Sequence, residues 1–214
     1  MIRKSKFLRN FPYLSRNFLG SHPYLYKSLW LMPKFRKNIV YPDTAICIDG
    51  FPKSANNFLI QCFSSWNKRV CVPSQIHLPM KIITAVKYNV PCIVTIRDPL
   101  FSIASILAVD PLLSYRIIIR SYIYFYKRIA KIKHNFIIAE FDKTIENPGL
   151  TVELLNKRYG TNFTYNLGKV PLRRPKSIED LKERQRGLKE DLRSELKKCD
   201  SIKEAQDVFL SFIN

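Results

Sequence analysis

Between residues 44 and 160, short apolar runs alternate with amphipathic segments, and this alternation limits the choice of fold more than any other feature of the sequence. Four runs are continuous in apolar and β-branched residues, which is typical of parallel strands covered on both faces. The expected strands are TAICID (44–49), RVCVP (69–73), PCIVTI (91–96) and NFIIAEF (135–141). The pattern predicts an α/β fold with three α/β/α layers around a central, mainly parallel sheet.

The segments between these runs carry helix signals at their ends. Asp98-Pro99 and Asp110-Pro111 each combine a good N-cap with the residue that suits the first helical position. Gly160 closes the last segment, as glycine often does after a helix. The expected helices cover residues 56–66, 80–88, 98–107, 110–132 and 147–160.

The two ends of the chain differ from this middle part. Residues 1–43 mix basic and aromatic residues and are interpreted as an N-terminal extension that packs on the domain. Residues 44–214 are expected to form one α/β domain, in which 170–214 are a helical tail. A second interpretation of residues 1–43 is a peripheral contact with an anionic membrane or a polymeric acceptor.

Leucine and isoleucine residues at helical spacing predict two amphipathic helices in the tail, over residues 177–198 and 201–213. Ser177 is the expected N-cap of the first helix. Ser201 and Glu204 have the spacing of a capping box at the start of the second.

The chain has 36 Lys and Arg residues against 17 Asp and Glu, a net charge of +19 over 214 residues. So large an excess implies an anionic partner, which could be a phosphorylated cofactor, an acidic glycan, a nucleic acid or an anionic membrane. Charge alone does not choose among these.

The five cysteines, at positions 47, 62, 71, 92 and 199, show no metal-ligand spacing and favour a reducing cytoplasm. The sequence has no apolar run of about 18 residues, the length a membrane span needs. The start MIRKSKFLRNF also lacks the apolar core of a signal peptide. We therefore expect a cytoplasmic protein, with any membrane contact peripheral.

Polar loops follow three of the expected strands and place chemically active side chains at strand ends. Lys53 follows the first strand, His77 the second and Arg97 the third. Because ligands of open α/β sheets bind at the carboxyl ends of the strands, these side chains are expected to converge on one rim. The rim would carry two cations and one titratable base.

The loop GFPKSANN (50–57) is not a nucleoside-triphosphate loop of the Walker A type. That motif needs G-x-x-x-x-G-K-[ST], whereas here two residues separate Gly50 from Lys53 and no second glycine is present. The loop could still bind phosphate or sulfate through Lys53 and the N-terminal amides of the following helix. On its own, Lys53 could equally be a solvated turn residue.

Three segments together are more specific than this loop alone. GFPKSANNFLI resembles the P-K-S-G-T-T-W loop of the sulfotransferases that use 3′-phosphoadenosine-5′-phosphosulfate (PAPS), and VPSQIHLP resembles their K-T-H-L-P segment. CIVTIRDPLFSIASIL resembles their strand with R-[DN]-P/A and a serine eight residues later, the spacing from Arg97 to Ser105. The resemblance covers about residues 44–160 and implies a P-loop NTPase-like sulfotransferase fold.

The resemblance also implies a role for each matching residue. His77 would be the catalytic base, and Lys53 would neutralise the leaving bisphosphate. Arg97 and Ser105 would hold the 3′-phosphate. The residues that would bind the 5′-phosphosulfate are Lys53, Ser54, Ala55, Asn56 and Asn57. No metal is expected.

The sequence departs from the family pattern at four places. Ala55 replaces a glycine and is expected to avoid positive φ, and Asn56-Asn57 replaces two threonines whose phosphate contacts the amide groups could supply. Gln75 replaces a lysine that assists the sulfuryl group. The family's C-terminal basic segment is absent, and the residues that could substitute for it are Arg173 and Arg174.

The expected function is transfer of a sulfuryl group from PAPS to an acceptor hydroxyl or amine. The acceptor would be a small molecule or a glycan, and the excess positive charge suggests an acidic or membrane-associated one. Three alternatives stay open. They are a weak or inactive protein that binds PAPS or its product 3′-phosphoadenosine 5′-phosphate (PAP), a metal-dependent P-loop enzyme, and a basic module for nucleic acid or an acidic polymer. No recognised nucleic-acid motif supports the last.

Overall fold

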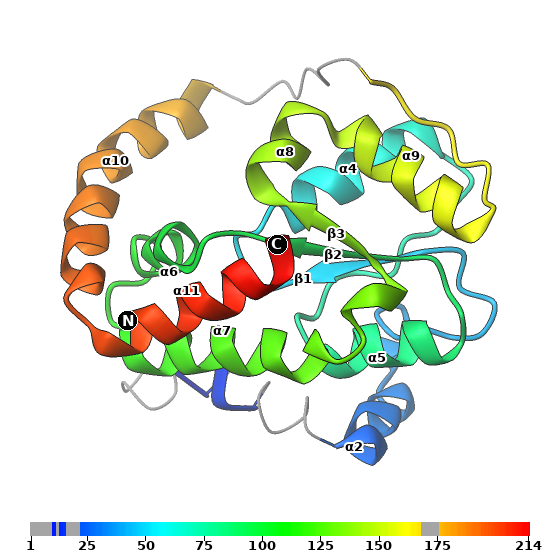
Figure 1. The fold of residues 1–214 in the computed structure, drawn as a ribbon, viewed down its shortest axis with the longest axis horizontal. Coiled ribbons are helices and arrows are strands. Elements are labelled where there is room, and N and C mark those ends of the chain that lie inside the picture. The colour runs from blue at the N-terminus through cyan, green and yellow to red at the C-terminus, as the bar shows by residue number, and fades with distance from the viewer. Residues whose placement is uncertain (1–9, 12, 16–21, 168–175) are drawn as a thin grey trace.

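The computed structural model describes residues 10–11, 13–15, 22–167 and 176–214, and its centre is a parallel sheet. The strands are β1 (Cys47–Gly50), β2 (Cys92–Ile96) and β3 (Ile137–Glu140), in the order β1-β2-β3. Both pairings are parallel (Figure 1). Cys47 lies opposite Cys92 and Ile93 opposite Ile137. The predicted α/β class with a parallel sheet is confirmed.

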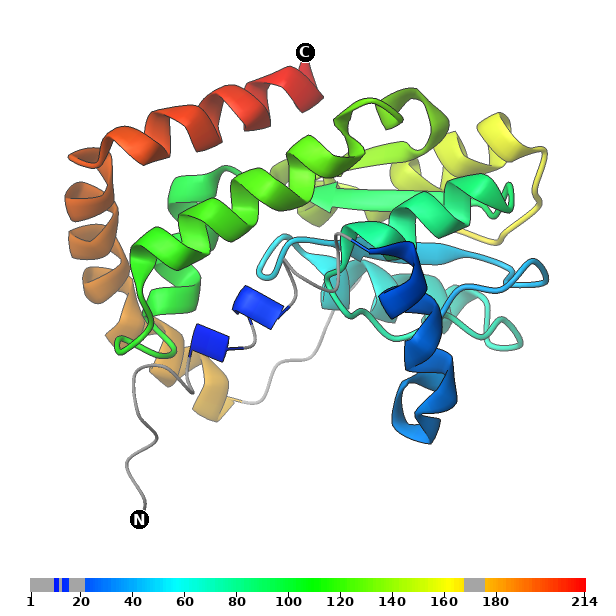
Figure 2. The same cartoon turned by 90° about the horizontal axis from the view of Figure 1, so that it is seen from below.

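Helices cover both faces of this sheet (Figures 1 and 2). One face packs on α5 (Pro79–Lys87), α7 (Tyr115–Ala130) and α11 (Asp200–Ile213), and the other on α4 (Asn56–Trp66) and α9 (Pro148–Tyr159). The helices α7 and α11 run beside each other in both views. The sheet is therefore the middle of three layers.

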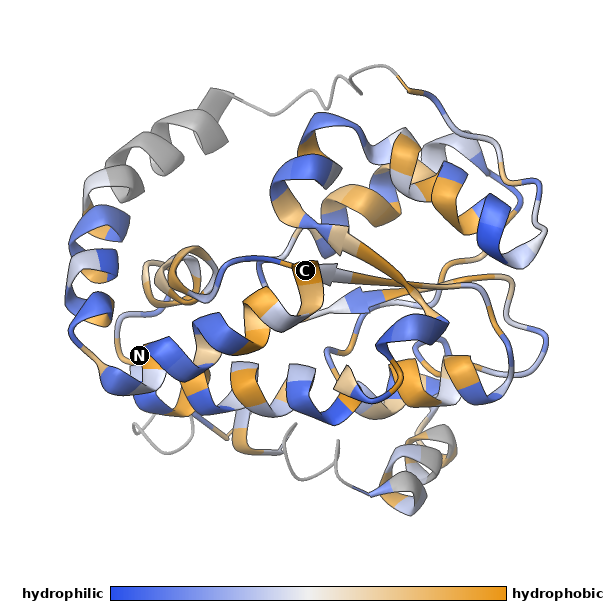
Figure 3. Ribbon diagram, in the orientation of Figure 1, coloured by the Kyte–Doolittle hydropathy of each residue, from blue (hydrophilic) through white to orange (hydrophobic). Residues whose placement is uncertain are grey.

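The strands are apolar because both of their faces are buried. Alternate residues of β1 and β2 belong to the two opposite cores, with Cys47 and Val94 on one side and Ile48 and Ile93 on the other. Figure 3 shows β3 as largely hydrophobic, whereas the described part of α10 (Lys176–Lys197) is mostly hydrophilic. Hydropathy thus distinguishes the buried strand β3 from the outer helix α10.

Two helices extend the α7 face at the carboxyl ends of the strands. Helix α6 (Pro99–Leu107) follows β2 directly and contributes Ile103 to the core, and α10 packs along α6 (Figure 1). The short elements η2 (Lys133–Asn135) and α8 (Phe141–Glu146) flank β3.

The described part of the N-terminal extension contains α2 (Pro23–Ser28), η1 (Leu29–Leu31) and α3 (Pro33–Arg36). Tyr26 of α2 is buried, and its hydroxyl accepts the backbone N–H of Val40 at 3.1 Å. This contact ties α2 to the segment before β1, and α2 also packs on α5.

The strand expected at residues 69–73 is wrong, because this segment forms no sheet ladder. Pro73 has no backbone N–H to donate, and its carbonyl accepts instead from Lys81, as does the carbonyl of Ser74. The backbone N–H groups of Ile76 and His77, which follow in the same segment before α5, donate to the Asp49 carboxylate. Side chains therefore satisfy backbone groups that a neighbouring strand would otherwise pair.

Three expected helix starts are also wrong. Helix α7 begins at Tyr115 rather than at Pro111, because Asp110 accepts the N–H of Leu112 within a turn. Ser177 is not an N-cap, since α10 already begins at Lys176. Helix α11 begins at Asp200, which puts Ser201 inside the helix and leaves no capping box with Glu204.

None of the helices in the described part of the chain is both long and apolar enough to cross a membrane. Cys47, Cys62 and Cys92 are buried, whereas Cys71 is exposed, and all five cysteines are free thiols.

Candidate functional site

The site is built around Gly50, where β1 ends against β2. A Cβ at this position would lie 2.2 Å from the carbonyl oxygen of Thr95, so only glycine fits between the strands. The loop that follows is tied down by Asn56, whose amide donates to the carbonyl of Phe51 at 2.9 Å and accepts from the Thr95 hydroxyl at 2.6 Å. The loop is thereby fixed over the carboxyl ends of β1 and β2.

His77 turns its Nδ1 atom toward this loop. Nδ1 lies 2.7 Å from the carbonyl oxygen of Gly50 and 3.2 Å from Oδ1 of Asp49. Both partners can only accept, so Nδ1 carries the proton and donates it. In the neutral ring the lone pair is then on Nε2, which is the form a general base needs. His77 has φ 57°, a strained backbone conformation of the kind that clusters at functional sites.

Asp49 is a fully buried carboxylate at the end of β1. It accepts the backbone N–H groups of Gly50, Ile76 and His77 at 2.8, 3.1 and 3.3 Å. Burial acts to raise the pKa of Asp49, but Lys81 and His77 outweigh it and hold this pKa below its usual value. Asp49 is therefore a buried anion that fixes the backbone and ring of His77.

Lys81 is the buried counter-charge. Its Nζ lies 3.4 Å from Oδ2 of Asp49, and both side chains are wholly inaccessible to solvent. Nζ also donates to the carbonyls of Pro73 and Ser74 at 3.3 and 2.9 Å. Lys81 thus links the end of β1 to the segment that carries His77, and the buried pair of Lys81 and Asp49 positions the His77 ring from beneath the surface.

An aromatic wall lies beside His77. A narrow cavity is lined by His77, Pro52 and the rings of Tyr13, Phe51, Tyr124 and Phe125. This cavity has a volume of only about 10 Å³, less than an acceptor group needs, so the aromatic wall closes this side of His77.

Arg97 approaches the same loop from the end of β2. Its Nη1 donates to the carbonyl of Lys53 at 3.3 Å, and its guanidinium lies 3.7 Å from the ring centroid of Phe141. The Tyr122 hydroxyl donates to the Arg97 carbonyl at 2.8 Å. Partial burial lowers the pKa of Arg97, although Asp142 and Asp98 oppose this. The structure thus brings Lys53, His77 and Arg97 to one loop.

Two further cations reach this place from α10. Burial lowers the pKa of Lys189, and the positive charges of Lys53, Arg97 and Arg193 lower it further. The Arg193 guanidinium lies 4.8 Å from the ring centroid of Phe101, which Arg97 also approaches at 5.8 Å. Four cations held this close repel one another, and a bound multivalent anion would relieve that repulsion.

The turn before α4 corrects the expectation for Ala55. Ala55 has φ 70° and Lys53 has φ 66°, so both are left-handed despite carrying a Cβ. The chain must reverse between β1 and α4, and the short Ala55 side chain tolerates this conformation at a strain cost of about 1–3 kcal/mol. Left-handed residues in such a turn point backbone N–H groups to one side, as in anion-binding nests.

The other predicted loop residues differ in what they can offer an anion. Ser54 is fully buried with its hydroxyl beside Tyr126, and the Asn56 amide is committed to the loop itself, so neither side chain is open to an anion. The exposed Asn57 side chain accepts a hydrogen bond from Gln75. Gln75 therefore bridges the two loops without supplying a charge.

Ser105 lies on α6, one turn beyond Phe101 and hence on the same helix face. It is partly exposed, whereas Ser102 is buried and donates to the Pro52 carbonyl at 2.8 Å. Arg173 and Arg174 lie outside the described residues.

Four functional candidates were missed by the sequence reasoning: Asp49, Lys81, Lys189 and Arg193. Asp49 carries a signal, because an acidic residue that closes an otherwise apolar strand is a candidate for a perturbed pKa. Lys189 and Arg193 are four residues apart and thus share a helix face, but nothing local shows what that face meets.

Comparisons of the chain with protein-family models, with curated proteins and with solved structures give no match. Function is therefore inferred from the geometry of the site.

Proposed function

We propose that this protein is a PAPS-dependent sulfotransferase with a P-loop type of sulfotransferase fold. The observation that supports it most is that the loop 50–57 contacts both His77, the proposed base, and the cation Arg97. The Gly50 carbonyl accepts from His77 Nδ1 at 2.7 Å, and the Lys53 carbonyl accepts from Arg97 at 3.3 Å. Sulfuryl transfer needs this pairing of a base for the acceptor with cations for a bisphosphate leaving group.

The cation cluster fits the anionic groups of PAPS. Lys53 would stabilise the charge that develops on the leaving 5′-phosphate, with the loop amides and the N-terminus of α4 holding the phosphate oxygens. Arg97, with Ser105 and the α10 cations Lys189 and Arg193, would bind the 3′-phosphate. In this proposal the α10 cations, rather than Arg173 and Arg174, replace the C-terminal basic segment of the family. No metal is required.

His77 would act on the acceptor. The acceptor oxygen attacks sulfur in line, the bond from sulfur to the 5′-phosphate oxygen breaks, and Nε2 of His77 takes the acceptor proton. Asp49 and Lys81 hold the ring in the productive tautomer. The products would be the sulfated acceptor and PAP. The free thiols of all five cysteines fit a reducing compartment such as the cytoplasm.

A second candidate, a protein that binds PAP or PAPS but transfers no sulfuryl group, is favoured by Gln75. Its neutral amide bonds to Asn57 where the resemblance places a lysine. The two candidates differ in turnover.

The test is incubation of the protein with PAPS labelled in the sulfuryl group, in the presence of pooled phenols, alcohols, amines and glycans. The proposal predicts that label moves to an acceptor and that PAP appears in equal amount. PAP binding without any label transfer would instead support the second candidate. A protein that binds neither nucleotide would contradict both.

A further inference from the structure

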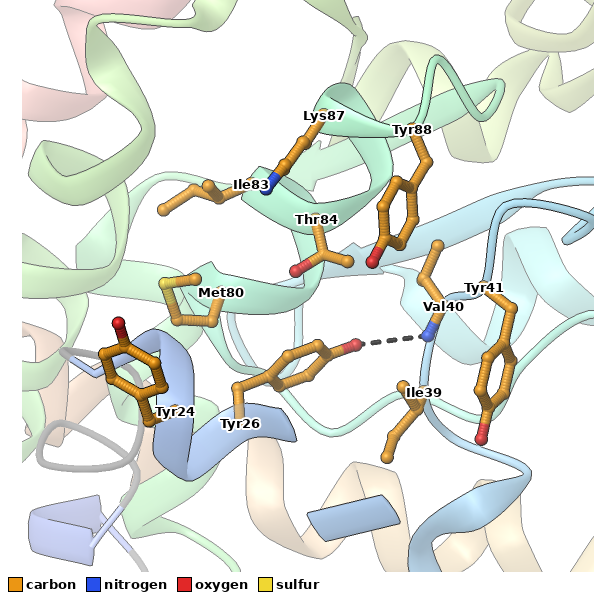
Figure 4. A pocket seen from close by; sticks show the side chains of 10 residues that line it. All are labelled: Tyr24, Tyr26, Ile39, Val40, Tyr41, Met80, Ile83, Thr84, Lys87 and Tyr88. Atoms are coloured by element: carbon orange, nitrogen blue, oxygen red, sulfur yellow. Dashed lines mark hydrogen bonds between the residues drawn. The ribbon is translucent and has the colours of Figure 1, made fainter. Parts of the chain in front are cut away.

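A separate pocket of about 530 Å³ lies between the N-terminal segment and α5 (Figure 4). Its volume is within the range of about 300–1,000 Å³ that is usual for small-molecule sites. Tyr24 and Met80 lie toward one end of the view and Tyr41 and Tyr88 toward the other, with Tyr26 between them. Neither His77 nor any of the four clustered cations lines this pocket.

The inner wall of the pocket is apolar and neutral. It is formed by Ile39, Val40, Met80 and Ile83 together with the ring of Tyr26. The Tyr26 hydroxyl already accepts the N–H of Val40 at 3.1 Å, and burial raises the pKa of this phenol above its ordinary value. This wall therefore suits a hydrocarbon chain and offers nothing to a buried charge.

The rim of the pocket is polar and positively charged. Thr84 and Lys87 follow Met80 and Ile83 at helical spacing, so all four lie on one face of α5. No Asp or Glu is present among the described residues that line the pocket, and Lys87 supplies their positive charge. A ligand with a single anionic head would match this rim.

We propose that the pocket binds a single-tailed amphiphile with an anionic head, its tail along Tyr26, Met80 and Ile83 and its head at Lys87. The site goes beyond the proposed sulfuryl transfer and does not depend on it. Its wall on α5 adjoins Lys81, which belongs to the same helix but is buried against Asp49.

Three probes with the same tail and different heads test this proposal: decanoate, decanol and decyltrimethylammonium. The two ionic probes are used below their micelle concentrations and decanol below its solubility limit. Calorimetry would give the affinity, and the Met80 methyl resonance would show the place of binding. We expect decanoate to bind once per chain, to shift the Met80 methyl signal, and to bind about fivefold more tightly than decanol. Decyltrimethylammonium should bind most weakly.

Lys87→Gln should weaken decanoate about fivefold and leave decanol unchanged. Lys157→Gln is the matched control, because Lys157 is also an exposed lysine in the last turn of a helix but lies on α9. Equal affinity for the three heads, an unmoved Met80 signal, or the same loss in both variants would overturn the proposal. None of these readouts involves PAPS, so failure here is distinct from failure of the proposed function.

Discussion

The carbonyl oxygen of Gly50 lies 2.7 Å from Nδ1 of His77 and decides which ring nitrogen carries the proton. A carbonyl can only accept, so neutral His77 keeps its hydrogen on Nδ1 and its lone pair on Nε2. The tautomer is therefore set by the backbone of the loop 50–57, with Asp49 in support.

His77 can be tested by spectroscopy and by activity. The ¹⁵N shifts of its ring at neutral pH should show the Nδ1–H tautomer, and Asp49→Asn should shift the population toward Nε2–H. His77→Gln should reduce sulfuryl transfer by about a hundredfold or more while leaving PAP affinity unchanged. An Nε2–H tautomer in the wild type, or full activity in His77→Gln, would show that the base is assigned wrongly.

Lys81 and Asp49 should be coupled in stability. Lys81→Met leaves a buried carboxylate without its counter-charge and should lower the free energy of unfolding by about 3–5 kcal/mol. Adding Asp49→Asn should then cost less than it does in the wild type, because the double variant buries no isolated charge. Urea unfolding of the four proteins measures this coupling, and strictly additive losses would contradict it.

The same pair predicts a pH dependence. The pKa of Asp49 is lower in the folded protein than the unfolded value of about 4. Its stabilising contribution is therefore complete above that value and is lost as the pH falls through the folded-state pKa. The stability difference between wild type and Asp49→Asn should shrink as the pH is lowered from about 5 to about 2. A difference that grew toward acid pH would have the wrong sign.

Gly50→Ala should be strongly destabilising, because the added Cβ would lie 2.2 Å from the Thr95 carbonyl oxygen. We expect a loss of about 3 kcal/mol or more in the free energy of unfolding and a displaced loop 50–57. Gly187→Ala is the matched control, since an added Cβ meets nothing within 4 Å inside α10. Thermal unfolding should show that this control is neutral or stabilised by up to about 1 kcal/mol. Equal effects at both positions would contradict the close approach of β1 and β2.

Lys189→Gln should change the stability of the protein and its affinity for PAP in opposite directions. Removing this cation should raise the melting temperature of the ligand-free protein, since burial, and then repulsion by Lys53, Arg97 and Arg193, lower the pKa of Lys189. PAP affinity should fall about tenfold, which is about 1.4 kcal/mol. Lys197→Gln, an exposed change in the last turn of the same helix, should do neither. Unchanged PAP affinity in Lys189→Gln would remove α10 from the site.

Local signals predicted much of the fold. The apolar run at 91–96 became β2, and the helix expected over 56–66 is α4 with the same bounds. Asp98 caps α6 as expected, accepting the N–H of Leu100 at 2.7 Å. These features depend on interactions between residues near one another in sequence, which is why patterns show them.

The rest depends on contacts between distant residues. RVCVP has the composition of a strand, but the backbone groups between it and α5 form hydrogen bonds with the side chains of Lys81 and Asp49. The sequence alone gives no reason to expect a buried lysine at position 81. Likewise, the sequence around Lys189 is typical of a solvent-exposed helix face. Only the packing of α10 on α6 brings this lysine close to Arg97. The placing of His77, Lys53 and Arg97 at strand ends could be predicted from the sequence. The buried pair of Asp49 and Lys81 and the α10 cations could not.

The most direct test of the central claim is a calorimetric titration with PAP in the presence of a metal chelator. We predict saturable binding of one PAP per chain without Mg²⁺, at least about tenfold weaker in Arg97→Ala and unchanged in Gly187→Ala. Absence of PAP binding to the wild type, together with tight binding of Mg·ATP, would contradict the assignment.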